Sequence, residues 1–241
     1  MMQRPSMAAQ GIIGSLLAVL IIGCWTIIHV WAVFVFTMPS FWVSIVVIAV
    51  LTWLSVGLFI VSHDAMHRSL IPDHPRLGYA IGAVALFLYA NFSIYKLMPK
   101  HFAHHDHSGL DEDPDFAPNA PGQALLWYKQ FIVAYFRWKE LLLMTLRVGV
   151  YLALGASMRN ILLFFALPSI LASFQLFYFG TYLPHRHEDE GFIDHHNART
   201  NDFGYLLSLL TCFHFGYHHE HHLKPGIPWW RLPSERKLLS R

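Results

Sequence analysis

Long runs of apolar residues dominate the hydrophobic pattern of this chain. Residues 11–36, 40–62 and 160–183 contain no Asp, Glu, Lys or Arg. Each run exceeds the about 20 residues that a helix needs to cross a membrane. Residues 141–157 form a weaker run, because Arg147 interrupts it, although a long basic side chain near a helix end can extend to the membrane surface. The pattern predicts an all-α integral membrane protein with four transmembrane helices in two hairpins.

Local signals refine the ends of these helices. Residues 37–39, Thr-Met-Pro, predict a tight turn inside the first hairpin, and Pro168 is expected to kink the last helix because proline removes a backbone hydrogen bond. Residues 1–10 carry one arginine and resemble the start of a signal peptide, but the apolar run behind them is too long and lacks a cleavage site. We therefore expect a retained first span and a single membrane-embedded domain over residues 1–241.

The uncharged segment 77–95 is also apolar, yet histidines lie on both sides of it. The stretch HDAMH at 63–67 precedes the segment, and HFAHH at 101–105 follows it. If the segment crossed the membrane, the two groups would face opposite sides and could not share a site. We therefore predict that 77–95 is an in-plane or re-entrant helix.

Basic residues cluster on one side of this arrangement, which also holds the later histidines and both termini. Cytoplasmic loops of membrane proteins carry an excess of Lys and Arg, so this side is predicted to face the cytoplasm. The basic residues are Arg4, Arg68, Lys96, Lys100, Arg186 and those of the tail 231–241.

Composition agrees with a bilayer environment. Hydrophobic residues make up 55% of the chain and charged residues 13%, whereas soluble domains carry about a quarter charged residues. The net charge of +2 gives no reason to expect a nucleic-acid partner. Cys24 and Cys212 are far apart and lack metal-site or disulfide spacing, so any metal here is not expected to be bound by cysteine.

Histidines are the candidate functional residues of this chain. The chain holds 17 histidines, and within the four predicted spans only His29 occurs, which we interpret as a buried histidine bonded to a neighbouring helix. The others include one HxxxH box and two HxxHH boxes. They are His63 and His67, then His101, His104 and His105, and finally His218, His221 and His222.

The spacing of these boxes predicts two metal ions. Positions i and i+4 share a helix face, so both rings of an HxxxH pair can bind one ion. The adjacent pair that ends each HxxHH box diverges by about 100° around the helix axis, so its members can serve different ions. Eight ligands exceed what one ion takes. A pH-sensing cluster would not need repeated spacing, and a metal-storage tract would be of low complexity. Imidazole suits iron, zinc and copper, and two irons that activate dioxygen fit the ligand count.

Several stretches of the chain resemble a known family. HDAMH (63–67), HFAHHDHSG with DPDF (101–109 and 113–116), FGTYLPHR (179–186) and the long stretch 201–233 are similar to the membrane fatty-acid desaturase and hydroxylase superfamily, and more narrowly to its β-carotene ketolases. One departure is Arg68, which follows the first box where the family usually has glycine.

The resemblance implies a ligand set and neighbours for it. A histidine after the last span completes the site in the superfamily, and His185 matches it here. The implied ligands are His63, His67, His101, His104, His105, His185, His218, His221 and His222. Asp64 and Asp202 are the expected carboxylate partners of the ligands. His214 and His187 are uncertain, as ligands or as partners of ligands, and so are His195, His196 and His219. His74 and His107 are expected at the surface.

The resemblance also implies a reaction. It is the dioxygen-dependent oxidation of C4 of a β-ionone ring by two successive hydroxylations and loss of water, converting β-carotene to echinenone and canthaxanthin and extending to zeaxanthin. No nucleotide-binding motif is present, so electrons are expected from ferredoxin or a similar donor. The docking surface of this donor is predicted at a cluster of basic residues, namely Lys224, Arg231, Arg236, Lys237 and Arg241. Attraction to anionic lipid explains the same cluster equally well.

An apolar tunnel from the lipid to the irons is expected, because the substrate lies in the bilayer. The candidate lining residues are Leu97, Phe102, Tyr178, Phe179, Tyr182, Phe213, Phe215 and Tyr217. The alternatives are a carotenoid 3-hydroxylase, a fatty-acid desaturase or alkane hydroxylase, and a metal transporter; a transporter would place its ligands mid-membrane. The expected location is a bacterial inner membrane or a cyanobacterial membrane, with the active site facing the cytoplasm.

Overall fold

The computed structural model describes residues 6–37, 40–188 and 191–239, and all regular elements in these ranges are helical. In chain order they are α1 (Met7–Phe34), α2 (Phe41–Met66), α3 (Pro75–Ala90), α4 (Ile94–His107), α5 (Ala124–Tyr135), α6 (Trp138–Ala153), α7 (Met158–Ile161), η1 (Leu162–Ala166), α8 (Leu167–Phe177), η2 (Tyr178–Tyr182), α9 (Leu183–His185), α10 (Tyr205–Cys212), α11 (His218–Leu223), η3 (Trp229–Arg231) and α12 (Leu232–Leu239).

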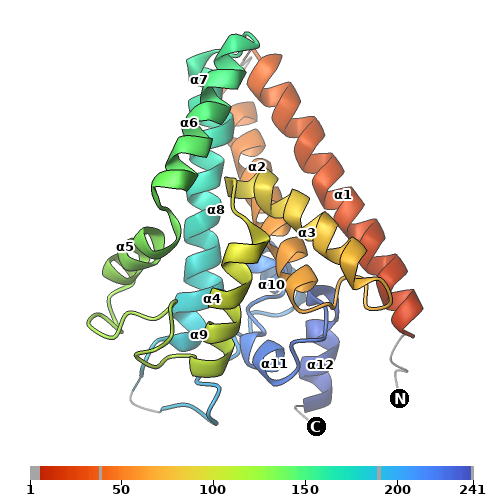
Figure 1. The fold of residues 1–241 in the computed structure, drawn as a ribbon, viewed down its shortest axis with the longest axis vertical. Coiled ribbons are helices and arrows are strands. Elements are labelled where there is room, and N and C mark those ends of the chain that lie inside the picture. The colour runs from red at the N-terminus through yellow and green to blue at the C-terminus, as the bar shows by residue number, and fades with distance from the viewer. Residues whose placement is uncertain (1–5, 38–39, 189–190, 240–241) are drawn as a thin grey trace.

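Three helices are long and apolar enough to cross a membrane, and they run along the long axis of the molecule (Figure 1). They are α1, α2 and the continuous helix Met158–His185, which contains α7, α8 and α9. This confirms the runs 11–36, 40–62 and 160–183 as helices. Of the turn predicted between the first two, residues 38 and 39 lie outside the described residues.

The long helix Met158–His185 contains two π-helical turns, and each ends two residues before a proline. The turn η1 precedes Pro168, and η2 precedes Pro184. Proline cannot donate to the carbonyl four residues earlier, and a π-turn is a local way for a helix to accommodate such a break. The kink expected at Pro168 therefore takes the form of a widened turn.

The weakest predicted span, 141–157, differs from the structure. The observed helix α6 has 16 residues and is about 24 Å long, which is too short to be one of the three candidate spans. It leads through a turn into α7 at the end of the molecule opposite α9 (Figure 1). The helical hairpin exists, but its first helix covers only part of the membrane thickness.

The side chain of Arg147 is directed at a neighbouring helix of the protein. Its guanidinium donates to the backbone oxygens of Leu88 and Phe87, at 2.9 and 2.6 Å, and to the side-chain oxygen of Asn91. These groups form the C-terminus of α3, where the last carbonyls of a helix generally lack i+4 donors; the oxygen of Phe87 also accepts from the backbone N–H of Asn91 at 2.9 Å. A positive charge at that position also complements the helix dipole.

Segment 77–95 lies across a sharp bend between α3 and α4. The two helices meet at 95°, and Asn91 at the bend has a left-handed backbone with φ of 57°. The rings of His63 in α2 and His101 in α4 have centroids 4.5 Å apart. The chain therefore returns to the end it came from, as the in-plane or re-entrant prediction requires (Figure 1).

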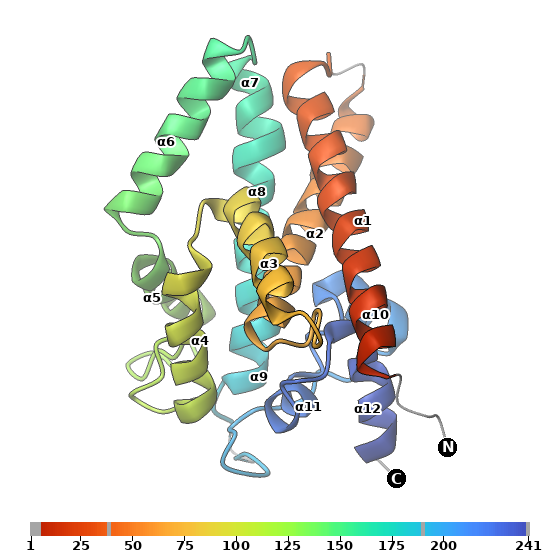
Figure 2. The same ribbon diagram turned by 45° about the vertical axis from the view of Figure 1, so that its right-hand side comes forward.

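Close packing of α3 on α2 supports this return. A Cβ atom at Gly82 would lie 2.5 Å from Cβ of Ala65, so only glycine allows this approach without a shift of the backbone. Ala65 lies next to Asp64 and two residues from His63. The short helices α10, α11 and α12 pack at the same end, where α1 begins (Figure 2). Segments that are far apart in the sequence thus meet at one end of the bundle.

The role of Arg147 predicts a loss of stability on its removal. Arg147→Met should lower the free energy of unfolding by about 2 kcal/mol, because the hydrogen bonds from a charged donor to the C-terminus of α3 are lost. Thermal denaturation of the purified protein in detergent measures this as a lower Tm. Arg159→Met, at an exposed position, is the matched control. Equal Tm values for the two variants would contradict the capping role.

Candidate metal centre

Five histidines from three helices form one group, here called the five-histidine cluster. It contains His63 and His67 from the end of α2, His101 and His105 from α4, and His221 from α11. Their ring nitrogens all lie within 4.8 Å of one another. The α2 pair is one helical turn apart, so both rings face the same side. This group brings the three histidine boxes together.

A second group, the four-histidine cluster, lies beside the first. It contains His104 from α4, His185 from α9, and His218 and His222 from α11, again with nitrogens within 4.8 Å of one another. All four side chains are buried. The two clusters touch where the rings of His105 and His222 stack with centroids 4.3 Å apart.

The two HxxHH boxes divide between the clusters as their helical phase predicts. In the first box, His101 and His105 belong to the five-histidine cluster, whereas His104 belongs to the four-histidine cluster. In the last box the division is reversed: His218 and His222 lie in the four-histidine cluster and His221 in the other. Positions i and i+4 stay together in both boxes, and the neighbour of the last position turns away by about 100°.

The nitrogen geometry fits metal ions better than it fits hydrogen bonds between the rings. Nε2 atoms face each other at 2.6 Å for His67 and His101, and at 3.1 Å for His221 and His105. Nε2 of His63 is buried and has no hydrogen-bond partner. Ligands bound at about 2.0–2.1 Å and at right angles lie about 3 Å apart.

The four-histidine cluster shows the same features. Nε2 atoms of His218 and His222 are 3.0 Å apart, and Nε2 of His185 is buried without a partner. Nδ1 of His185 lies 2.7 Å from the backbone oxygen of Asn197. A ring that donates from Nδ1 leaves Nε2 as a free lone pair, the tautomer that binds metal.

Burial keeps three histidines of α11 neutral. It lowers the pKa values of His218, His221 and His222 well below the usual range for histidine, and neighbouring histidines lower them further. Metal ligation requires the neutral imidazole, so these rings are already in the binding form at pH 7. Neutral nitrogen donors suit iron, zinc or copper. The histidine clusters are therefore compatible with a metal site.

A carboxylate that our sequence interpretation did not select supports His104. Nδ1 of His104 lies 3.0 Å from both carboxylate oxygens of Asp113, which also accepts from the backbone N–H groups of Gly109 and Asp115. Burial works to raise the pKa of Asp113, but these hydrogen bonds outweigh it and hold the pKa below its usual value. The sequence signal that could have identified this carboxylate is the DPDF stretch, which begins with Asp113, eight residues after the last histidine of the second box.

Asp64 and Asp202, which the sequence predicted as carboxylate partners of the ligands, make other contacts in the structure. Asp64 is buried, but its nearest oxygen is 3.8 Å from Nδ1 of His63, and it accepts instead from the backbone N–H of Trp229 at 3.2 Å. It therefore anchors the C-terminal segment to α2. Asp202 is exposed and pairs with Arg236, so the structure does not place it beside a ligand.

His214 and His187 lie outside both clusters. The chain leaves α10 at Cys212, and His214 has a left-handed backbone with φ of 62°, so it shares no helix face with His218. The ring of His214 packs against Tyr205 instead. His187 lies against Phe116, with Nε2 3.1 Å from the backbone oxygen of Gly109. Neither residue replaces or joins the nine clustered histidines.

The remaining histidines have other surroundings. His195 and His196 form a partly exposed group with Asp194, whose carboxylate is 2.9 Å from Nε2 of His219. His29 is buried and its Nε2 lies 2.9 Å from the hydroxyl of Tyr151 in α6, which confirms its interpretation as a packed histidine.

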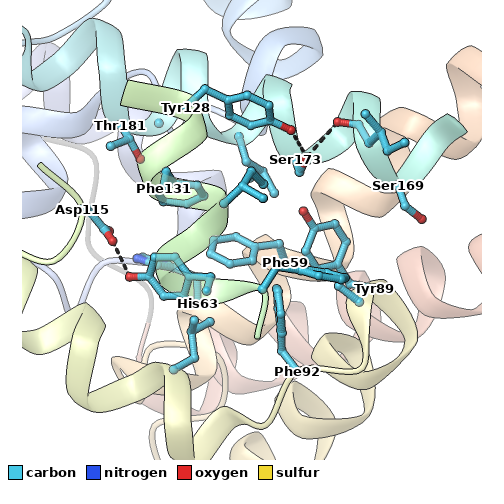
Figure 3. Close-up of a pocket in the computed structure, with 18 of the residues that line it drawn as sticks. Phe59, His63, Tyr89, Phe92, Asp115, Tyr128, Phe131, Ser169, Ser173 and Thr181 are labelled. Atoms are coloured by element: carbon cyan, nitrogen blue, oxygen red, sulfur yellow. Dashed lines mark hydrogen bonds between the residues drawn. The ribbon is translucent and has the colours of Figure 1, made fainter. Parts of the chain in front are cut away.

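A cavity of about 460 Å³ ends at both histidine clusters (Figure 3). Its wall is mostly apolar and comes from α2, α3, α4, α5, α6, α8 and their neighbours. It reaches His63 and His101 of the five-histidine cluster, and His104 and His218 of the four-histidine cluster. Other lining residues are Phe59, Tyr89, Phe92, Tyr128, Phe131, Tyr135, Phe136, Met144, Phe165 and Leu176.

Only two of the eight predicted lining residues border this cavity, namely Leu97 and Phe215. The other six, which are Phe102, Tyr178, Phe179, Tyr182, Phe213 and Tyr217, pack elsewhere. Phe213, for example, stacks on Trp53 with ring centroids 4.4 Å apart. The prediction took aromatic residues near the boxes in sequence, whereas the actual wall also draws on α3, α5, α6 and α8, which carry no histidine box.

Comparison with known proteins agrees with this geometry. The sequence profile of the fatty acid desaturase family matches residues 37–146 and 129–241, a span that includes all nine clustered histidines. The chain belongs to the fatty acid desaturase family. Membership of this family makes the chain an oxidoreductase.

Relatives within the family are named as ketolases. The chain is 46% identical to the beta-carotene ketolase of Paracoccus sp. strain PC1 over 99% of this chain and 98% of that one. It is 55% identical to the beta-carotene ketolase of a second Paracoccus strain over 77% and 76% of the two chains. It is 35% identical to the beta-carotene ketolase of Haematococcus lacustris over 98% and 82%.

Arg68, which stands where the family usually has glycine, has an unusual backbone conformation. Arg68 has φ of 57°, in the left-handed region where glycine is favoured and most other residues are strained. Its side chain is exposed, and His63 and His67 before it both lie in the five-histidine cluster.

Proposed function

We propose that this chain is a carotenoid 4-ketolase, which oxidises the C4 methylene of β-ionone rings to a ketone. The observation that carries the proposal is the apolar cavity that ends at both histidine clusters. An apolar hydrocarbon ring that enters such a cavity removes its surface from water against a mostly apolar wall, which is favourable. The beta-carotene ketolase names of relatives at 46% and 55% identity support the substrate class.

The cofactor we propose is a pair of iron ions. The five-histidine cluster and the four-histidine cluster would each hold one, through nine neutral imidazoles. When bound, such irons would supply the activation of dioxygen that breaking the allylic C4–H bond requires, since acid–base chemistry alone cannot break it. The contribution of the protein is to hold the ring nitrogens in place, as Asp113 does for His104 and the backbone of Asn197 does for His185.

The overall reaction needs two oxidation rounds on one carbon. In each round, one oxygen atom of O₂ enters a C–H bond, the other leaves as water, and two electrons and two protons are consumed. The first round gives an alcohol and the second a geminal diol, which loses water to give the ketone. The apolar cavity wall holds the ring and keeps bulk water away from the site.

The electrons come, in this proposal, from ferredoxin or a similar one-electron donor on the cytoplasmic side of a bacterial or cyanobacterial membrane. Some of the basic residues predicted to form the docking surface already pair with acidic residues of this chain. Lys224 pairs with Glu235, and Arg236 pairs with Glu220 and Asp202. Arg241 lies outside the described residues. The docking surface stays a prediction.

Pigment analysis tests the proposed function. A bacterium that accumulates β-carotene and expresses this chain should form echinenone and canthaxanthin, detected by chromatography and mass spectrometry. Zeaxanthin as the product would mean a 3-hydroxylase with the same metal site. Unchanged β-carotene, with the protein present in the membrane and loaded with iron, would contradict a carotenoid substrate and favour fatty acids or alkanes.

A further inference from the structure

Two hydrogen-bonded pairs interrupt the apolar wall of the cavity. Near the histidines, the hydroxyl of Tyr135 donates to Oδ1 of Asp115. On another part of the wall, the hydroxyl of Tyr128 and Oγ of Ser173 lie 2.6 Å apart. Figure 3 shows Asp115 on the same side of the cavity as His63, with the pair formed by Tyr128 and Ser173 separate from it.

Asp115 is held firmly at the end of the cavity nearest the metal centre. Its backbone N–H donates to Asp113 at 2.8 Å, and its backbone oxygen accepts from Nε1 of Trp127 at 2.6 Å. Lys100 lies over the ring of Tyr135, with Nζ 4.5 Å from its centroid. The Asp115 side chain therefore has a defined direction, although it lies in a loop.

The two carboxylate oxygens of Asp115 have different surroundings. Oδ1 accepts the hydrogen bond from Tyr135, whereas Oδ2 lies 4.0 Å from Nδ1 of His104, beyond hydrogen-bond distance. Nδ1 of His104 is already used by Asp113 at 3.0 Å. Among the described residues Oδ2 thus receives no hydrogen bond, and Asp115 lines the cavity beside a histidine of the four-histidine cluster.

A carboxylate acceptor has no use for a ring that carries only carbon and hydrogen. Burying a polar group without a hydrogen-bond partner costs free energy, so an acceptor at this position indicates that a donor arrives during the reaction. The alcohol formed in the first round brings an O–H group to the carbon next to the metal centre. It is the donor that the chemistry of the proposed function supplies at this end of the cavity.

We propose that Asp115, oriented by Tyr135, binds the hydroxyl of the 4-hydroxylated ring and retains this intermediate for its second oxidation. The inference rests on the proposed function and adds a residue that decides between alcohol and ketone as the released product. No covalent step is assigned to Asp115. It accepts a hydrogen bond from the alcohol O–H, which keeps the remaining C4–H bond directed at the metal centre while the next O₂ and two electrons arrive.

The test compares Asp115→Leu with the wild-type chain in membranes supplied with β-carotene. The leucine side chain is similar in size and cannot accept a hydrogen bond. We expect the ratio of 4-hydroxylated to 4-keto product to rise about tenfold, the effect of losing one hydrogen bond to a charged group. Asp115→Asn, whose amide oxygen can still accept, should restore most of the wild-type ratio. Asp111→Leu, which removes an exposed carboxylate from the same loop outside the cavity wall, should leave the ratio unchanged.

A binding measurement separates retention of the alcohol from a structural role. Without dioxygen, titration of the purified protein with the 4-hydroxylated carotenoid, followed by its visible absorption, should give a Kd about tenfold higher for Asp115→Leu than for the wild type. The Kd for β-carotene should be equal in both, which also shows that the cavity is folded. An equal fall in both products with an unchanged ratio, or an equal Kd for the alcohol, would overturn the proposal.

The two proposals fail in different ways. If the wild-type chain forms no 4-oxygenated product from β-carotene, the proposed function itself fails. If the wild type forms the ketone and Asp115→Leu forms ketone and alcohol in the same ratio, the ketolase stands and the role of Asp115 fails.

Discussion

His185→Ala is expected to abolish ketone formation, whereas His187→Ala should retain activity within about twofold. His185 belongs to the four-histidine cluster, and its Nε2 is buried without a partner. His187, two residues later, contacts Gly109 and Phe116 and lies outside both clusters. In the proposed centre His185 is one of four ligands to one iron, and losing one member of a group that acts as a unit abolishes most of the activity of the whole group.

The measurement has two parts. Ketone per unit of membrane protein should fall by more than about 1,000-fold for His185→Ala, since the chemistry depends on a complete centre. Elemental analysis of the purified variant should give one iron per chain in place of two, because the five-histidine cluster is unchanged. Equal losses in His185→Ala and His187→Ala would show that the segment matters for folding and that His185 is not a ligand.

Asp113→Asn is expected to lower activity or iron affinity by about 10–100-fold, the range typical for carboxylates that support a metal-binding histidine. Both oxygens of Asp113 lie 3.0 Å from Nδ1 of His104, so this carboxylate selects the tautomer that leaves Nε2 free. An asparagine amide has one acceptor oxygen and no charge, so it holds the ring less firmly. Iron retention against a chelator, measured with ketone formation, gives the two readouts.

Asp111→Asn provides the matched control for this substitution. Asp111 is exposed and lies in the same loop two residues earlier, so the change of charge is the same without contact to His104. It should behave like the wild type. If Asp113→Asn loses no iron and forms ketone at the wild-type rate, the bond between Asp113 and His104 does not tune the centre.

Much of this architecture was predictable because it depends on local pattern. Apolar runs of sufficient length predicted α1, α2 and the helix Met158–His185, since a bilayer demands continuous apolar helices. The phase of the two HxxHH boxes predicted that adjacent histidines would belong to different groups, because a helix turns by about 100° per residue. The nine histidines that the family resemblance implied as ligands are the nine that the clusters contain.

The errors share a physical cause, which is that they concern contacts between segments far apart in the chain. The side chain of Arg147 is directed at the C-terminus of α3, some 60 residues earlier, which its local sequence did not indicate. Asp202 and Asp113 looked alike as loop carboxylates, and only the fold brings Asp113 to His104. His214 was open as a ligand or a partner of ligands, and the left-handed backbone at His214 directs its ring away from both clusters.

The sequence alone thus determined three of the four predicted spans, the histidine boxes and the division of these boxes into two groups, because each depends on spacing along one helix. The tertiary structure decided which carboxylate supports the ligands, where the re-entrant bend lies and which side chains line the cavity. These depend on how helices pack across long sequence distances, and packing is set by the shapes of all neighbours together. Asp115 became a candidate for binding the intermediate only when α5 and α4 were seen to place it, with Tyr135, beside the histidines.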